Sequence, residues 1–209
     1  MSESITIESL KGLFREIFII LKQSNPKVKQ IWIEPSEVEH FRDLNRYQIN
    51  EFLEIINSVS IEKGNYTDYI VIDKIKFIVE AIKLLDQDIG QLSMIIDFGG
   101  FEELIAEILK LNNYKTLNNF RFSDNSNFKS PNSQKKYEID IIGIQKKYLL
   151  LIDAKQWKKK DCFSAMSKAG NLQVQRAKAL KNNIKILTKL LNEFGINQKF
   201  EKLILIPFM

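Results

Sequence analysis

The stretch YEIDIIGIQKKYLLLIDAKQW, residues 137–157, decides the fold of the second half of the chain. Two segments rich in Ile, Leu and Tyr flank the polar residues 145–147, which is the pattern of a β-hairpin with a tight turn. If the turn consists of residues 146–147, counting outward places Asp140 directly opposite Asp153 on the partner strand. The sequence therefore predicts two neighbouring carboxylates at one end of a hairpin.

Further charged residues lie on the same face of this hairpin. Side chains alternate between the faces of a strand, so Lys155 shares a face with Asp153, and Glu138 shares one with Asp140. The same register puts Glu138 opposite Lys155. Like charges directly opposite each other destabilise a sheet, and a bound divalent cation is the simplest compensation. The alternative is a set of solvated ion pairs at a strand end, worth at most about 1 kcal/mol.

Length and composition fit a globular protein. The 209 residues, 44% of them hydrophobic, suit one large domain or two small ones with a real core. We expect a cytoplasmic protein without membrane association, because the first residues lack the features of a signal peptide and no run approaches the roughly 20 apolar residues of a membrane span. The single cysteine, Cys162, excludes an internal disulfide, and the single histidine, His40, excludes the usual zinc sites. A metal site must therefore use oxygen ligands.

Charge is distributed unevenly along the chain. Residues 1–98 carry 11 Lys+Arg against 16 Asp+Glu, whereas residues 99–209 carry 20 and 10. A basic second half suits a polyanionic partner, and a Lys-rich solvated surface explains it nearly as well. We expect two domains with these bounds, joined at Gly99-Gly100.

The first half has the element order of a winged helix. The pattern predicts a helix over 6–23, a strand over 31–34, a helix opening at Pro35, a helix over 47–58, a hairpin that turns at Gly64-Asn65, and a helix over 73–89. This mostly helical domain resembles the winged-helix fold in element order only. The expected recognition helix near 46–58 carries Glu51 and Glu54 with one arginine, which suits dimerisation or protein docking at least as well as DNA binding.

The second half opens with an amphipathic helix over residues 101–114. Glu102 lies at the border of its apolar stripe and is expected either to point into a site between helix and sheet or to cap the first turn. Glu103 and Glu107 are expected to be solvated.

A strand over 114–122 and a polar loop precede the hairpin, and one long helix ending near Leu191 and a short buried strand over 201–209 follow it. Gln173 is the polar member of the long helix's inward stripe, where it either makes a structural hydrogen bond or contacts a phosphate. Arg176, on the same helix, and Lys158, Lys159 and Lys160 are expected to bind nucleic acid.

The order αβββαβ, with Glu102 on the first helix, Asp140 in EIDIIG and then Asp153-Ala154-Lys155, resembles the PD-(D/E)xK nuclease superfamily. The segments FEELIAEIL, EIDII and DAKQW are most similar to archaeal Holliday junction resolvases and Mrr-type endonucleases. The resemblance covers residues 99–207. It implies an α/β restriction endonuclease-like core with a mixed sheet.

The resemblance also implies a function. It implies DNA phosphodiester hydrolysis that depends on Mg²⁺ or Mn²⁺, with Glu102, Asp140, Asp153 and the carbonyl of Ala154 as metal ligands. Lys155 would orient the attacking water, and Glu138 is an auxiliary candidate. We expect a homodimer acting on DNA with no small-molecule cofactor.

Two other interpretations remain open at this point. A catalytically silent protein that binds nucleic acid or an assembly partner would use the same fold as a scaffold, although the complete acid, acid, Asp-x-Lys set favours the enzyme. A transcription regulator acting through residues 1–98 is weakened by the acidic recognition helix.

Overall fold

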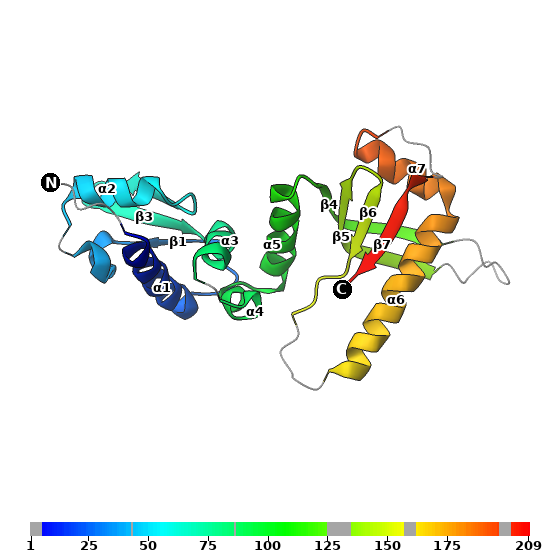
Figure 1. Ribbon diagram of the computed structural model, residues 1–209, viewed down its shortest axis with the longest axis horizontal. Coiled ribbons are helices and arrows are strands. Elements are labelled where there is room, and N and C mark those ends of the chain that lie inside the picture. Colours follow the sequence, from blue (N-terminus) through cyan, green and yellow to red (C-terminus); the bar gives the residue numbers. More distant parts are fainter. Residues whose placement is uncertain (1–5, 43, 86, 125–134, 157–161, 197–201) are drawn as a thin grey trace. The chain divides into compact units, whose positions relative to one another are not determined.

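A computed structural model describes the chain in six stretches, residues 6–42, 44–85, 87–124, 135–156, 162–196 and 202–209 (Figure 1). The chain divides into two compact units, Met1–Leu104 and Ile105–Met209. The division falls inside helix α5 (Phe98–Leu111). The two expected domains, 1–98 and 99–209, stay a prediction.

The first unit combines helices with a small antiparallel sheet of strand order β1-β3-β2. Its elements are α1 (Ile7–Gln23), β1 (Gln30–Ile33), the 3₁₀ helices Pro35–Glu37 and Glu39–Phe41, α2 (Arg46–Glu54), β2 (Val59–Lys63), β3 (Asp68–Asp73), α3 (Lys74–Leu84), α4 (Ile89–Leu92) and the 3₁₀ helix Ser93–Ile95. The predicted first helix, short strand and hairpin are confirmed.

The helix predicted at Pro35 is wrong, because two 3₁₀ helices take its place. Glu34 and Glu37 form a reciprocal capping box around the first of them, and the backbone of Val38 is extended between the two. An extended residue ends a helix at that point. The next helix, α2, stops at Glu54, four residues before the predicted end at residue 58.

The second unit is a four-stranded mixed sheet, order β4-β5-β6-β7, with helices (Figure 1). Strands β4 (Lys115–Asp124), β5 (Lys135–Gln145) and β6 (Tyr148–Ile152) are antiparallel neighbours, and β7 (Ile204–Phe208) runs parallel to β6. Such a mixed α/β arrangement is compatible with a nuclease-like fold. Helices α6 (Phe163–Asn182) and α7 (Ile184–Glu193) pack against the sheet through leucines such as Leu180 and Leu190.

The central hairpin has the predicted register. Gln145 pairs with Tyr148, and the ladder continues to the pair Ile141 and Ile152. Lys146 in the turn has a φ of 53°, the left-handed conformation that two-residue hairpin turns require. The counting that places Asp140 beside Asp153 therefore starts from a confirmed turn.

Helix α5 begins earlier than predicted. Gly99 and Gly100 lie in its first turn rather than in a joint. Asp97 explains this, because its carboxylate accepts a hydrogen bond from the Gly100 N–H at 2.9 Å and its carbonyl accepts one from the Phe101 N–H. An aspartate in this position compensates for the low helix propensity of glycine.

The predicted single long helix is two helices. Asn183 separates them, with φ −103° and ψ 82°, and its side chain caps α7 by accepting from the Ile186 N–H at 3.3 Å. Ile184, expected on the inward stripe, is 64% exposed for this reason. The last strand is also less buried than predicted, because β7 is an edge strand whose terminal residues, Ile204 and Phe208, are exposed.

Among the described helices, none combines the length and the apolar character that crossing a lipid bilayer requires.

Candidate active site

Asp140 and Asp153 meet at the open end of the β5–β6 hairpin. They follow directly on the last ladder pair, and the Oδ2 of Asp140 accepts a hydrogen bond from the N–H of Ala154 at 2.9 Å. The backbone N–H of Asp153 donates to the Phe208 carbonyl at 3.0 Å, which fixes this position to β7. Asp140 is half-buried and Asp153 is fully buried.

The environment of Asp140 disfavours its ionised form. Burial raises the pKa of the Asp140 carboxyl most, and the charge and side-chain hydrogen bond of Asp153 raise it further. The Ala154 N–H and the Lys155 ammonium act in the opposite direction without cancelling these effects. Two carboxylates that share one site commonly share a proton or a cation for this reason.

Two cations neutralise Asp153. Its Oδ1 lies 3.0 Å from the NH1 nitrogen of Arg176 and 3.3 Å from the Nζ of Lys155. The Arg176 side chain is only 13% exposed, whereas that of Lys155 is 37% exposed. Arg176 is therefore a nearly buried structural partner, and Lys155 is the cation that solvent and a substrate can reach.

Gln173 connects the helix of Arg176 to the hairpin. Its Nε2 donates to the Leu151 carbonyl on β6 at 2.7 Å, and its Oε1 accepts from the NH1 of Arg176 at 2.9 Å. The side chain is buried. The structural hydrogen bond foreseen for Gln173 is present, and the contacts of both residues with nucleic acid stay a prediction.

The sequence pattern did not reveal Arg176 as a partner of Asp153. The feature of the sequence that could have indicated this partner is the three-residue spacing from Gln173, which puts both side chains on one side of α6. The charge of the helix suggested a solvated, phosphate-binding arginine instead.

The sheet changes its alternation at the level of Asp140. Ile139 and Ile142 both belong to the apolar cluster between the sheet and α6, although strict alternation would put them on opposite faces. On β4, Leu117 and Phe120 behave in the same way. The inward face therefore shifts by one residue on both strands at the same level.

Asn119 lies at this shift and has a φ of 56°. The β4–β5 pairs on either side of Asn119 place position 119 opposite position 140 on β5. Asparagine tolerates the left-handed region better than most residues. Non-glycine residues in this region often mark functional sites, and alternation patterns alone gave no signal for it.

Glu138 has a different partner from the one expected. Both Nε and NH2 of Arg121 donate to its Oε1, at 3.0 and 2.8 Å, and Arg121 is its cross-strand neighbour on β4. The predicted place opposite Lys155 is outside the register, because the β5–β6 ladder ends at Ile152.

The other expected ligands have these positions. Glu102 lies half-buried on α5, and its part in the site stays a prediction. In the stretches that the structure describes, no group of three or more His, Cys, Asp or Glu side chains is placed to hold a metal ion. The predicted phosphate contacts Lys158, Lys159 and Lys160 lie outside the described residues.

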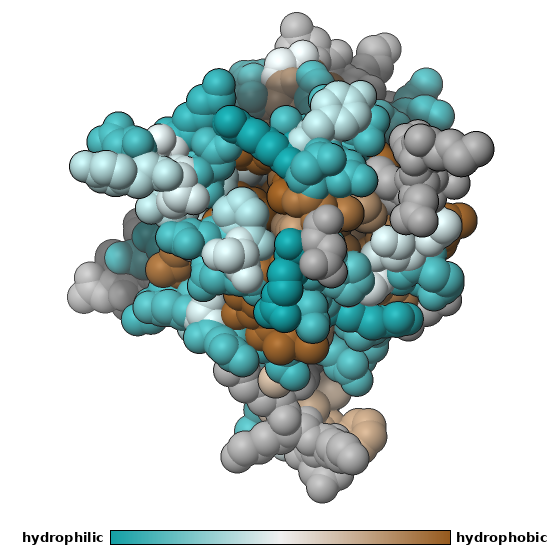
Figure 2. Space-filling view, turned by 90° about the vertical axis from the view of Figure 1, so that its left-hand side faces the viewer, coloured by the Kyte–Doolittle hydropathy of each residue, from teal (hydrophilic) through white to brown (hydrophobic). Residues whose placement is uncertain are grey.

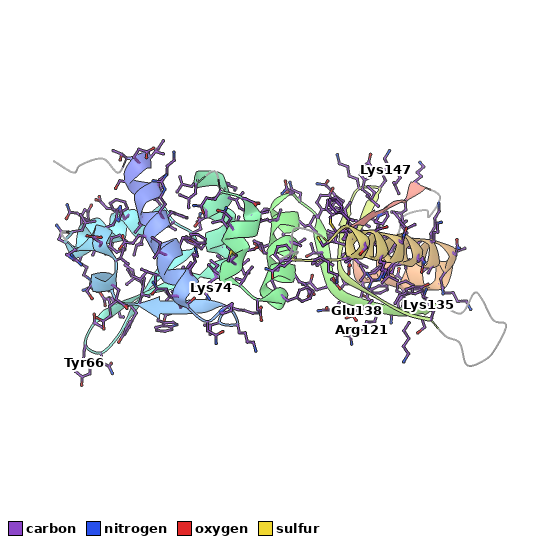
Figure 3. The ribbon with its side chains drawn as sticks, turned by 90° about the horizontal axis from the view of Figure 1, so that it is seen from below. Tyr66, Lys74, Arg121, Lys135, Glu138 and Lys147 are labelled. Carbon is purple, nitrogen blue, oxygen red and sulfur yellow. The ribbon has the colours of Figure 1, made fainter. Side chains whose placement is uncertain are left out.

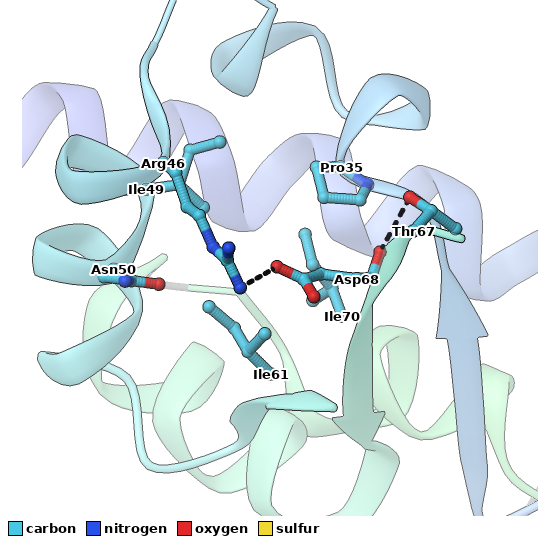
Figure 4. Close-up of a pocket in the computed structure, with 8 residues that line it drawn as sticks. All are labelled: Pro35, Arg46, Ile49, Asn50, Ile61, Thr67, Asp68 and Ile70. Atoms are coloured by element: carbon cyan, nitrogen blue, oxygen red, sulfur yellow. Dashed lines mark hydrogen bonds and ion pairs between the residues drawn. The ribbon is translucent and has the colours of Figure 1, made fainter. Parts of the chain in front are cut away.

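The first unit contains a separate small cavity. It has a volume of about 200 Å³, an apolar wall that includes Ile49 and Ile61, and an ion pair between Arg46 and Asp68 at 2.5 Å (Figure 4). Arg46 is the arginine of the expected recognition helix, so its pairing with Asp68 further weakens a phosphate-binding role for α2.

Hydrophilic side chains cover most of the face shown in Figure 2, and apolar patches interrupt them.

A mixed α/β unit with two adjacent carboxylates and a reachable lysine is compatible with a nuclease-like hydrolase. Residues 100–207 match the nuclease-related domain family, and because this match spans more than half of the sequence, the chain belongs to that family. No curated protein and no solved structure matched the chain. Family membership suggests nuclease activity in general, with nucleic acid as the substrate.

Proposed function

We propose that this protein is a metal-dependent endodeoxyribonuclease that hydrolyses phosphodiester bonds in DNA. The observation that carries the proposal is the meeting of Asp140 and Asp153 at one hairpin end, with Lys155 3.3 Å from Asp153. All three residues lie within the region that matches the nuclease-related domain.

The donor set fits Mg²⁺ or Mn²⁺. Carboxylate oxygens are the ligands these ions prefer, and the raised pKa of Asp140 marks a place where a cation would relieve burial and repulsion. Asp140 and Asp153 would hold the ion, with the Ala154 carbonyl as a further ligand; Glu102 would join them only if its side chain moved toward the pair. The bound ion would supply Lewis-acid stabilisation of the charge that develops on the phosphate.

The side chains of the chain itself have distinct roles in this proposal. Lys155 orients the attacking water and stabilises negative charge with its ammonium group. From α6, Arg176 donates to Asp153 at 3.0 Å and so holds it in place. Gln173 accepts a bond from Arg176 at 2.9 Å and fixes the arginine. Neither needs to touch the substrate for this role.

The substrate and assembly belong to the same proposal. The resemblance to Holliday junction resolvases and Mrr-type endonucleases favours branched DNA or a restriction or repair substrate. Cutting both strands of a duplex calls for two active sites, so we propose a homodimer, which sedimentation of the protein with and without DNA would test.

A cleavage assay tests the activity. Purified protein is incubated with plasmid, linear, single-stranded and four-way-junction DNA in Mg²⁺, Mn²⁺ or EDTA. Asp140→Asn and Lys155→Ala are compared with Lys147→Ala, which removes an exposed lysine from the hairpin turn.

The proposal expects cleavage that requires metal, falls at least about a hundredfold in the two site variants and persists in the control. Cleavage that survives in Asp140→Asn, or that proceeds equally in EDTA, would show that another site or a contaminant is responsible. Intact DNA in every reaction, with unchanged binding, would favour a catalytically silent scaffold.

A further inference from the structure

A polar face runs along β4 and β5 away from Asp140. On β5 the buried residues Tyr137 and Ile139 alternate with Lys136, Glu138 and Asp140, which are exposed or half-buried. Alternation places these three polar side chains on one face of the strand.

The neighbouring strand continues this face. Arg121 is the cross-strand partner of Glu138, and Ser123 is the partner of Lys136. Arg121 is 75% exposed, while Phe122 beside it is buried and packs against Tyr137 with ring centroids 5.3 Å apart. The polar face therefore rests on a rigid aromatic layer.

The surface is hollowed at this place. An open cavity of about 360 Å³ is lined by these residues of both strands, from Arg121 to Ser123 and from Lys136 to Glu138. Figure 3 shows Arg121, Glu138 and Lys135 together on one side of the second unit, with Lys147 on the opposite side. The hollow has the carboxylate site at one end, because Glu138 is two residues from Asp140.

Positive charge predominates in the hollow. The guanidinium of Arg121 is held by Glu138 at 2.8 Å, which fixes its position, and Lys136 is exposed. Lys135 does not line the hollow: its Nζ donates to Gln175 on α6 at 2.9 Å, on the other face of β5. Within the hollow, the two cations Arg121 and Lys136 outnumber the single carboxylate of Glu138.

We propose that this face is a track for the sugar–phosphate backbone of the DNA substrate, on which Arg121 and Lys136 contact phosphates next to the bond that is cut. The inference rests on the proposed nuclease function and adds the path of the substrate.

The dimensions agree with such a path. The five residues from Lys136 to Asp140 are separated by four rises of about 3.4 Å and span roughly 13 Å. One strand of B-form DNA presents a phosphate about every 3.4 Å along the helix axis, so the track covers a few nucleotides. Arg121 and Lys136, which lie on neighbouring strands, suit phosphate contacts, and such contacts do not read the base sequence.

Binding in EDTA tests the track without requiring cleavage. Fluorescence anisotropy of the full chain with a labelled duplex of roughly 20 base pairs is measured between about 50 and 200 mM salt. The double variant Arg121→Gln/Lys136→Gln is compared with Lys146→Gln/Lys147→Gln, which removes the same charge from the hairpin turn at the other end of β5.

The track variant is expected to bind roughly tenfold more weakly at about 0.1 M salt, and the slope of log Kd against log salt should fall by about 1.8, or 0.9 for each lost phosphate contact. The turn variant should behave as the wild type. Equal losses in both variants, an unchanged slope in the track variant, or no DNA binding by the wild type would each overturn the track.

Cleavage by the wild type in Mg²⁺ is scored separately. Track-dependent binding without any cleavage would support the DNA path and overturn the nuclease. Metal-dependent cleavage with track-independent binding would do the reverse.

Discussion

The ion pair between Arg176 and Asp153 gives the most direct test of how the site is held. Replacing Arg176 with methionine removes two hydrogen bonds of its NH1, to Asp153 at 3.0 Å and to Gln173 at 2.9 Å. Breaking a buried pair from one side costs about 3–5 kcal/mol, because the remaining charge stays buried. Lys155 still lies 3.3 Å from Asp153, so we expect the lower end, a loss of about 3 kcal/mol.

Urea unfolding at pH 7 measures this loss. Lys178→Met is the matched control, because it removes an exposed cation from the same helix and should change the free energy of unfolding by no more than about 0.5 kcal/mol. The double variant Arg176→Met/Asp153→Asn should be more stable than Arg176→Met alone, since the uncompensated carboxylate is gone. A loss below about 1 kcal/mol, or a further loss on adding Asp153→Asn, would refute the reasoning.

Three further predictions concern single positions. The Nζ of Lys74 is buried and donates to the carbonyls of Asn25 and Ile95, and burial lowers the pKa of this lysine. Because the folded chain holds this proton less tightly than the unfolded chain, urea unfolding should show the wild type gaining stability over Lys74→Met between about pH 7 and pH 10. A constant difference between the two proteins would contradict this. Burial opposes ionisation of Glu16, but the N–H groups of Glu39 and His40 and the ring of His40 together lower its pKa. Its stabilisation is present above the ordinary value and is lost as pH falls, so Glu16→Gln should cost about 1–2 kcal/mol at pH 7 and much less near about pH 3, and an equal cost at both pH values would count against it. Asn119→Val should cost about 1–2 kcal/mol in thermal unfolding because φ is positive there, while Asn118→Val on the same strand should be neutral or stabilising, and equal effects would argue against a left-handed residue 119.

The hairpin was predictable because two short-range rules were sufficient. Alternating apolar residues defined both strands, and a two-residue turn between them left one register, so Asp140 and Asp153 were paired correctly from the sequence. The same counting put Glu138 opposite Lys155, but Glu138 accepts from Arg121 on β4 instead, and the β5–β6 ladder ends at Ile152. Where a strand stops depends on its tertiary neighbours and not on its own pattern.

The missed features involve caps and long-range partners. The apolar spacing continues across Asn183, so periodicity alone could not reveal that this residue ends one helix and caps the next. Gly99 and Gly100 suggested a joint, but Asp97 draws them into a helix. Arg176 was expected to bind nucleic acid, and its ion pair with Asp153 was missed because Asp153 is distant in sequence and becomes a neighbour only after folding.

The parallel pairing of β6 with β7 also has a consequence during synthesis of the protein. Asp153 is bonded through its backbone to Phe208, and β6 pairs along its whole length with Ile204–Phe208. When Asp153 has emerged from the ribosome, the nascent chain still lacks β7, the strand that fixes this residue. The non-local pairing of β6 with β7 forms only after the intervening helices have been made. The backbone bond that fixes Asp153 beside Asp140 therefore forms only after residue 208 has left the ribosome.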